Sequence, residues 1–184
     1  MTTSMDNSLE YNTSAEMERL AVDELKKRGL YYAPVDVSRL ARELGLEIYS
    51  ASFENPSISG LIRKERIGLT SREETIIYFN RAINRDCVRF IIAHEIGHWY
   101  LGHLEQNSDG IFDDQLDLYR RRCSVNSEYR TEVDANRFAA SLLMPRELVI
   151  SFWEETSGNI EAMARRFQVS AVEMGYRADY VDRN

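Results

Sequence analysis

The sequence is poor in cysteine and in basic residues, and it contains no long apolar run. Two cysteines in 184 residues are too few for a disulfide framework, so we expect a reducing compartment. Acidic residues outnumber basic ones by 30 to 23, and a net charge of -7 argues against a broad electrostatic grip on nucleic acid. No apolar stretch approaches the roughly 20 residues that a membrane span requires. We therefore expect no direct binding to nucleic acid or to a membrane. The partner is expected to be a protein.

The amino-terminal residues also lack the features of a signal peptide. They are polar, with no basic region, apolar region or cleavage site, so we expect a cytoplasmic protein. Hydrophobic residues make up 43% of the chain, and 184 residues are enough for one domain with one main hydrophobic core.

The first half of the chain is predicted to contain two helices and three strands. Thr13 and Glu16 have the spacing of a capping box, and Gly29 can end the helix that follows. A shorter helix is predicted between a cap at Asp36 and Gly45. Three short segments rich in β-branched and aromatic residues predict a small, mainly antiparallel sheet: 46–53, 58–64 and 74–80.

The second half is predicted to be mainly helical. A long helix should run from about 85 to 101, and residues 104–131 are polar and irregular. Pro145 can end one helix and open the next, and Ser170 and Glu173 have capping-box spacing. The predicted helices after the polar segment are 131–145, 146–156, 160–167 and 171–181. We therefore expect three parts: a flexible amino terminus (1–14), a core with a polar insertion near 104–131 (15–145), and a helical carboxy-terminal subdomain (146–184).

All three histidines of the chain lie in one stretch, "IIAHEIGHWYLGH", residues 91–103. In a helix, His94 and His98 project from the same face, so both imidazoles can reach one ion at about 2.0–2.1 Å. Glu95 lies roughly 100° around the helix axis, where it is better placed to hold an activated water than to bind the metal. This arrangement is typical of zinc peptidases, in which the carboxylate takes the proton of the attacking water.

An amphipathic helix with two histidines at this spacing by chance is the alternative. Val88, Ile92, Ile96 and Trp99 form an apolar stripe, so the helix is half buried in either case. Histidine is scarce in this chain, and the motif therefore favours a metal site.

A catalytic zinc needs a third protein ligand, and the nearby candidates are poorly placed. His103 is not on the histidine face and is one residue short of the metzincin spacing, so we interpret it as a polar residue at the helix end. Cys87 lies about 10.5 Å along the axis from His94, which favours a place in the core. Cys123 falls in the irregular polar segment.

Glu132 is the stronger candidate for the third ligand. It opens a helix in which Ala135 and Ala139 leave a low surface for the close approach of another helix. Asp134 points roughly 200° away from Glu132, so both carboxylates cannot face one ion. Asn136, one turn after Glu132, can hydrogen-bond to a ligand.

These motifs together resemble the ImmA/IrrE family of zinc metallopeptidases. The family-like segments are "HEIGH", "EVDANRFAA" and "LLMP", with "PVDVSRLARELGLEI" and Ser59-Gly60 before them in similar order and spacing, over roughly residues 15–180. The resemblance implies an α+β, zincin-like fold, with a three-stranded sheet packed on the histidine helix and a glutamate helix. It also implies one Zn²⁺ per chain held by His94, His98 and Glu132, with Glu95 as general base.

The same resemblance implies a substrate, a helix-turn-helix repressor of the Xre type whose cleavage would switch on stress or mobile-element genes. Two alternatives stay open: a partner that captures such a repressor without cutting it, and a hydrolase of small molecules. The last two predicted helices could also form a DNA-binding unit, but the acidic chain favours packing beside the core. If the chain is a peptidase, we expect the substrate to lie along an edge strand formed by 58–64 or 75–80.

Overall fold

The computed structural model describes residues 14–67, 72–106, 111–114 and 127–183. Thr13, Cys123 and most of the predicted polar insertion lie outside these ranges. Of the predicted flexible segment 1–14, only Ser14 is described, and it begins the first helix. The elements along the chain are α1 (Ser14–Lys27), α2 (Val37–Glu43), β1 (Leu46–Ala51), β2 (Ile58–Ile67), β3 (Arg72–Asn80), α3 (Arg85–Tyr100), the 3-10 helix η1 (His103–Gln106), β4 (Ile111–Asp114), α5 (Ser127–Leu143), α6 (Arg146–Thr156), α7 (Ile160–Phe167) and α8 (Ala171–Arg183).

The sheet has the strand order β1-β3-β2-β4. Strand β1 is parallel to β3, whereas β2 is antiparallel to both β3 and β4. The three predicted strands are present and the α+β class is confirmed, and β4 is a fourth strand within the region predicted as a polar insertion.

The expected edge strands are wrong. Residues 75–80 pair with β1 on one side and β2 on the other, so they lie inside the sheet. Strand β2 pairs with β4 between Ile58 and Ile62. The outer strands among the described residues are therefore β1 and β4. Residues 75–80 lie inside the sheet because β1 pairs with β3, and residues 58–62 lie inside because β4 pairs with β2. Strand β4 could not be predicted because its four residues do not alternate between apolar and polar.

Helix ends follow the predicted local signals. The Asp36 side chain accepts a hydrogen bond from the backbone N–H of Arg39 at 2.9 Å, and Gly45 has a φ of +78° after α2. Ser170 and Glu173 form the predicted capping box, with each side chain accepting a hydrogen bond from the other residue's backbone N–H.

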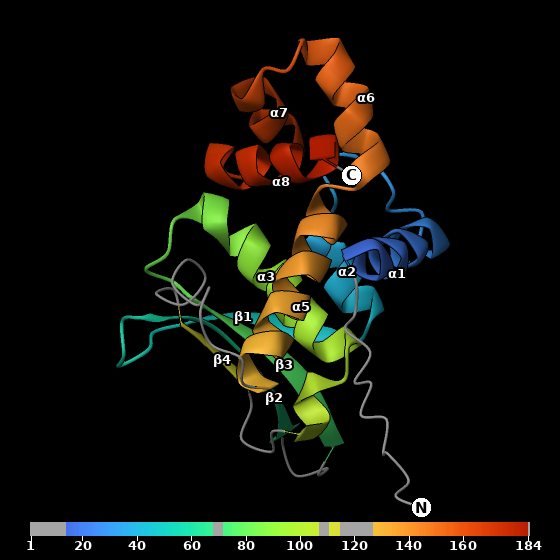
Figure 1. Ribbon diagram of the computed structural model, residues 1–184. Helices are drawn as coiled ribbons and strands as arrows, with labels where there is room; N and C mark the ends of the chain where they lie inside the picture. Colours follow the sequence, from blue (N-terminus) through green and yellow to red (C-terminus); the bar gives the residue numbers. More distant parts are fainter. Residues whose placement is uncertain (1–13, 68–71, 107–110, 115–126, 184) are drawn as a thin grey trace, which may run out of the picture.

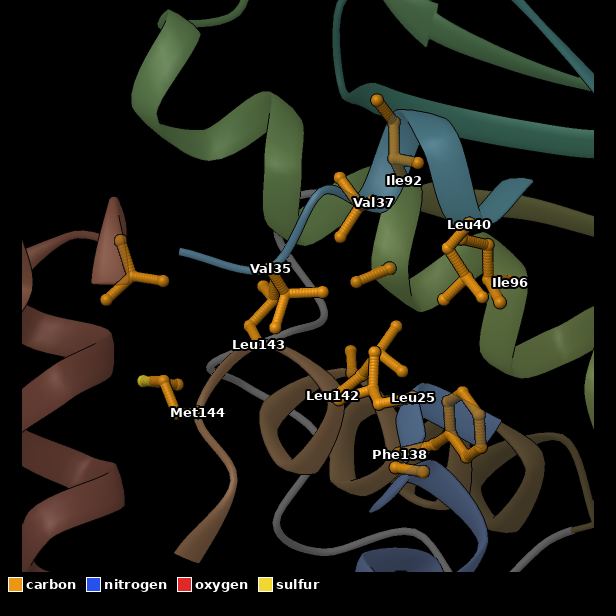
Figure 2. Packing of buried hydrophobic residues seen from close by; sticks show 14 of the residues in the cluster. Leu25, Val35, Val37, Leu40, Ile92, Ile96, Phe138, Leu142, Leu143 and Met144 are labelled. Carbon is orange, nitrogen blue, oxygen red and sulfur yellow. The ribbon is translucent and has the colours of Figure 1, made fainter. Parts of the chain in front are cut away.

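The helices stack in layers on the sheet. Helix α3 contacts β2 and β3, α5 contacts α3, and α1 contacts α5, so α3 lies between the sheet and α5 (Figure 1). Buried side chains from these helices and from α2 form the core in Figure 2, including Leu25, Leu40, Ile96, Phe138 and Leu142. The predicted apolar stripe on α3 faces this core, with Ile92 and Ile96 buried and Val88 and Trp99 partly buried. Helix α3 is therefore held on two sides, which fixes the side chains that it carries.

The carboxy-terminal helices α6, α7 and α8 gather at the end of the molecule away from the sheet (Figure 1). Arg177 of α8 is buried, donates to the carbonyl of Met144 at 2.8 Å and pairs with Glu18 of α1. Glu18 also accepts a hydrogen bond from the backbone N–H of Arg146 at 2.7 Å. Polar contacts thus join α8 and the start of α6 to α1. None of the helices in the described ranges has the length and apolar character needed to cross a membrane.

Candidate metal centre

Helix α3 carries three fully buried polar side chains, those of His94, Glu95 and His98. The histidines lie one helical turn apart, and their Nε2 atoms are 2.9 Å from each other. The two ring nitrogens therefore face one shared point beside α3.

Glu132 of α5 completes this cluster. Its Oε2 atom lies 3.3 Å from Nε2 of His94, and its Oε1 atom lies 3.3 Å from Nε2 of His98. One ligand atom from each of the three residues lies within 4.8 Å of the others, and these residues form the group that could hold a metal ion in the described part of the chain. The two predicted histidines and the predicted glutamate are thus brought together.

The close approach of α5 to α3 is possible because position 97 is a glycine. A Cβ atom on Gly97 would lie 3.1 Å from the carbonyl oxygen of Ala135 and 3.2 Å from its Cα. Ala135 and Ala139 are both fully buried, in agreement with the predicted low surface on α5. The small residues on both helices allow the short distance between α3 and α5 at which Glu132 reaches the histidines.

The spacing of the donors fits a zinc ion. Bonds of about 2.0–2.1 Å in a tetrahedral zinc site place neighbouring ligand atoms about 3.3–3.4 Å apart. The two separations between a histidine nitrogen and a carboxylate oxygen, 3.3 Å each, match this spacing, and the 2.9 Å between the two nitrogens is somewhat shorter. Two imidazoles and one carboxylate are also the donor set of many catalytic zinc sites, which leave a fourth position open.

Asn136 lies behind His94, where the sequence predicts it. Its Oδ1 atom is 3.0 Å from Nδ1 of His94. An amide oxygen only accepts, so the ring proton of neutral His94 is on Nδ1, and the lone pair of Nε2 faces the cluster.

The other ligand candidates lie elsewhere. The Asp134 carboxylate is 3.6 Å from the Arg137 guanidinium on the same helix, and Cys87 is not part of the cluster. Helix α5 begins at Ser127 rather than at 131, so Glu132 is in its second turn. The earlier start was missed because residues 127–130 are mostly polar and carry no clear apolar period.

His103 is the residue whose place the sequence interpretation misjudged. It is 7% exposed, and its Nδ1 atom lies 3.0 Å from Nδ1 of His98. Helix α3 ends at Tyr100, and Gly102, with a φ of +75°, turns the chain into η1 so that His103 returns beneath His98. Gly102 was the available signal, since a left-handed glycine after a helix reverses the direction of the next residues.

Glu95 faces the sheet across a second glycine. A Cβ atom on Gly60 of β2 would lie 2.4 Å from Oε1 of Glu95 and 2.7 Å from Cγ2 of Ile91. The Glu95 carboxylate therefore occupies space that any other residue at position 60 would fill. Gly60, which the sequence places among the family-like segments, is the residue of β2 that lies against the motif glutamate.

Comparison with known families identifies the family of the chain. Residues 41–179 match the family described as IrrE N-terminal-like domain, Peptidase_M78. The chain belongs to the IrrE N-terminal-like domain family. This is the ImmA/IrrE metallopeptidase family that the sequence motifs resemble, and the two histidines and the glutamate of the cluster match a metallopeptidase site.

A solved structure shares the fold of this IrrE-like chain. It is a Mycobacterium tuberculosis transcriptional regulator, with a TM-score of 0.60 and 15% sequence identity. The match covers 91% of this chain but 48% of that protein, so the chain spans about half its length. The comparison with curated proteins gave no match.

The electrostatics of the IrrE-like site favour a cation. Burial raises the pKa of the Glu132 carboxyl, but hydrogen bonds and charge from His94 and His98 outweigh burial and hold this pKa below its ordinary value. Burial, with the neighbouring His98 next in importance, lowers the pKa of His103 to about 4. At neutral pH the site therefore combines an ionised carboxylate with a neutral third histidine.

Proposed function

We propose that this chain is a zinc-dependent endopeptidase that cleaves a helix-turn-helix repressor of the Xre type and thereby derepresses stress or mobile-element genes. The observation that carries the proposal is the meeting of His94, His98 and Glu132 beside the buried carboxylate of Glu95. A binding protein would need neither three donors at zinc spacing nor a carboxylate next to them.

In this proposal one Zn²⁺ per chain is held by His94, His98 and Glu132. Asn136 orients His94, because its amide oxygen at 3.0 Å fixes which ring nitrogen is protonated. The chemistry that zinc supplies when bound is Lewis-acid activation of a carbonyl group and of water.

Glu95 then acts as the general base. It takes a proton from the attacking water and can pass that proton to the leaving amine of the cut peptide. Gly60 keeps β2 from displacing its carboxylate, and the rigid packing of α3 between the sheet and α5 holds its position.

The substrate class rests on charge and on the comparisons. A net charge of -7 is unfavourable for direct contact with nucleic acid, so an effect on transcription would pass through a protein. The structurally similar Mycobacterium tuberculosis protein is described as a transcriptional regulator, which supports a regulatory role. We also propose that the protein acts in the cytoplasm, where its substrate would bind DNA, and that residues 146–184 form a helical subdomain beside the peptidase core.

A peptide substrate would be held extended along β4. Asp113 of β4 pairs in register with Gly60, which contacts Glu95, whereas β1 is at the opposite side of the sheet. An outer strand offers backbone groups to an extended peptide, and β4 is the outer strand nearer to the catalytic carboxylate.

The test is co-expression with an Xre-type repressor encoded beside the gene. Wild-type protein should cut the repressor, and Glu95→Gln should bind zinc but cut it roughly 10²–10⁴-fold more slowly, because an amide cannot take a proton from water. Fragments are followed on a gel, and zinc content is measured on the purified variant. Equal cutting by both proteins would remove Glu95 from the mechanism. Derepression by Glu95→Gln without cutting would favour the non-proteolytic alternative.

A further inference from the structure

His103 is a buried histidine outside the set of proposed metal ligands. Its ring lies edge to face with that of His98, with centroids 5.1 Å apart and an interplanar angle of 69°. The two Nδ1 atoms are 3.0 Å apart, which is hydrogen-bond distance. A hydrogen bond between two ring nitrogens requires one protonated nitrogen and one lone pair.

The position of His98 decides which nitrogen donates. Its Nε2 atom points toward His94 and Glu132, at 2.9 and 3.3 Å. If that nitrogen binds a cation it must present its lone pair, and the ring proton of neutral His98 is then on Nδ1. His98 therefore donates to His103, and Nδ1 of His103 is the acceptor.

Each of the two histidines of the cluster then has a hydrogen-bond acceptor behind its Nδ1 atom, which we call its support. Nδ1 of His94 donates to the Asn136 oxygen at 3.0 Å, and Nδ1 of His98 donates to the His103 nitrogen at the same distance. The supports come from different elements, since Asn136 is on α5 and His103 is on η1. An acceptor behind a ligand fixes the rotation of its ring and makes its other nitrogen a stronger donor.

We propose that His103 is a positioning residue that orients His98 for the metal by accepting its Nδ1 proton. The proposal rests on the proposed function, because it assigns His98 as a zinc ligand. It gives the turn at Gly102 a role at the site, since that turn returns His103 to the back of the ligand. The alternative is that His103 only fills space in the core beside His98.

A matched pair of substitutions separates these two roles. Asparagine and leucine have nearly the same shape, but His103→Asn keeps an acceptor near the position of Nδ1 and His103→Leu does not. Zinc affinity is measured by competition with a chelator for wild type and both variants. We expect roughly 10–100-fold weaker zinc binding for His103→Leu, the usual loss when such a support is removed, and near wild-type binding for His103→Asn. Thermal unfolding of the metal-free proteins reports on the fold.

A second measurement observes the hydrogen bond itself. With three histidines in the chain, ¹⁵N-histidine labelling gives a spectrum simple enough to assign each ring. We expect a protonated Nδ1 on His98 and a nitrogen–nitrogen coupling to Nδ1 of His103 in the zinc-loaded protein. This measurement needs no variant, so it decides the proposal even if His103→Leu fails to fold.

Three results would overturn the proposal. They are wild-type zinc affinity in a folded His103→Leu, equal loss in His103→Leu and His103→Asn, and a His98 ring protonated on Nε2 in the zinc-loaded protein. Failure of wild-type protein to bind zinc is a separate result, because it would reject the metal site itself and the proposed function with it.

Discussion

Glu132 is the member of the cluster that solvent reaches. Its side chain is 21% exposed, whereas those of His94 and His98 are fully buried. In the proposed peptidase, the substrate would approach from the exposed side, where the Glu132 carboxylate lies. The same exposure makes Glu132 the proposed ligand that can be replaced with the least damage to the core.

Replacement of Glu132 should therefore test ligation without unfolding the protein. Glu132→Ala should lower the zinc content of dialysed protein toward zero, because two histidines alone hold the ion weakly. Asp134→Ala should leave zinc near one ion per chain, since Asp134 contacts Arg137 instead. Zinc is measured by atomic absorption, and circular dichroism reports on the fold. The reverse pattern would make Asp134 the ligand.

Gly60 provides a test of the proposed general base in which Glu95 itself is not substituted. A methyl group on Gly60 would fall 2.4 Å from Oε1 of Glu95, so Gly60→Ala should displace the carboxylate and lower the rate of cleavage while zinc is retained. Gly175→Ala is the control, because a Cβ atom at that helical position has open space around it. The control should be stable and active. Full activity of Gly60→Ala would show that the carboxylate can move aside without cost.

At the scale of elements, the prediction concerns the two outer strands. Binding of an intact repressor to the inactive Glu95→Gln protein should slow amide exchange in β4, because an extended peptide would pair with that strand. Strand β1, at the other side of the sheet, serves as the internal control. Hydrogen exchange followed by mass spectrometry measures both in one sample. Protection of β1 instead of β4 would place the substrate on the wrong side for Glu95.

Local signals in the sequence predict most of the elements and the proposed ligands. Capping at Asp36 and Ser170, the spacing of His94 and His98, and the low surface at Ala135 are properties of short segments, and the structure agrees with each of them. Strand β4 and the return of His103 depend on contacts between segments distant along the chain or across a turn. Such contacts leave no periodic pattern in either partner, and Gly102, which marks the turn before His103, does not show which residue His103 meets after it.

At the scale of the whole molecule, Arg177 joins the last helix to the first. It is 6% exposed and pairs with Glu18, whose side chain is 19% exposed. Arg177→Ala would remove one partner of this buried pair, which costs at most roughly 3–5 kcal/mol because Glu18 keeps the Arg146 N–H. Urea unfolding should show a clear loss of stability. Arg39→Ala, which breaks an exposed pair with Glu43, should change it little. Equal stability of the two variants would mean that the Arg177 pair contributes nothing net.

The contacts of Glu18 also bear on how the protein is made. Its two partners lie 128 and 159 positions later in the chain. At roughly 5–20 residues per second, a ribosome needs roughly 8–32 s to reach Arg177 after Glu18. Until residues 127–143 have been synthesised, the apolar stripe of α1 (Met17, Ala21 and Leu25) lacks the helix α5 that contacts α1 in the fold. This apolar surface therefore stays uncovered by α5 for most of synthesis, and a chaperone that shields α1 during that time would reduce aggregation.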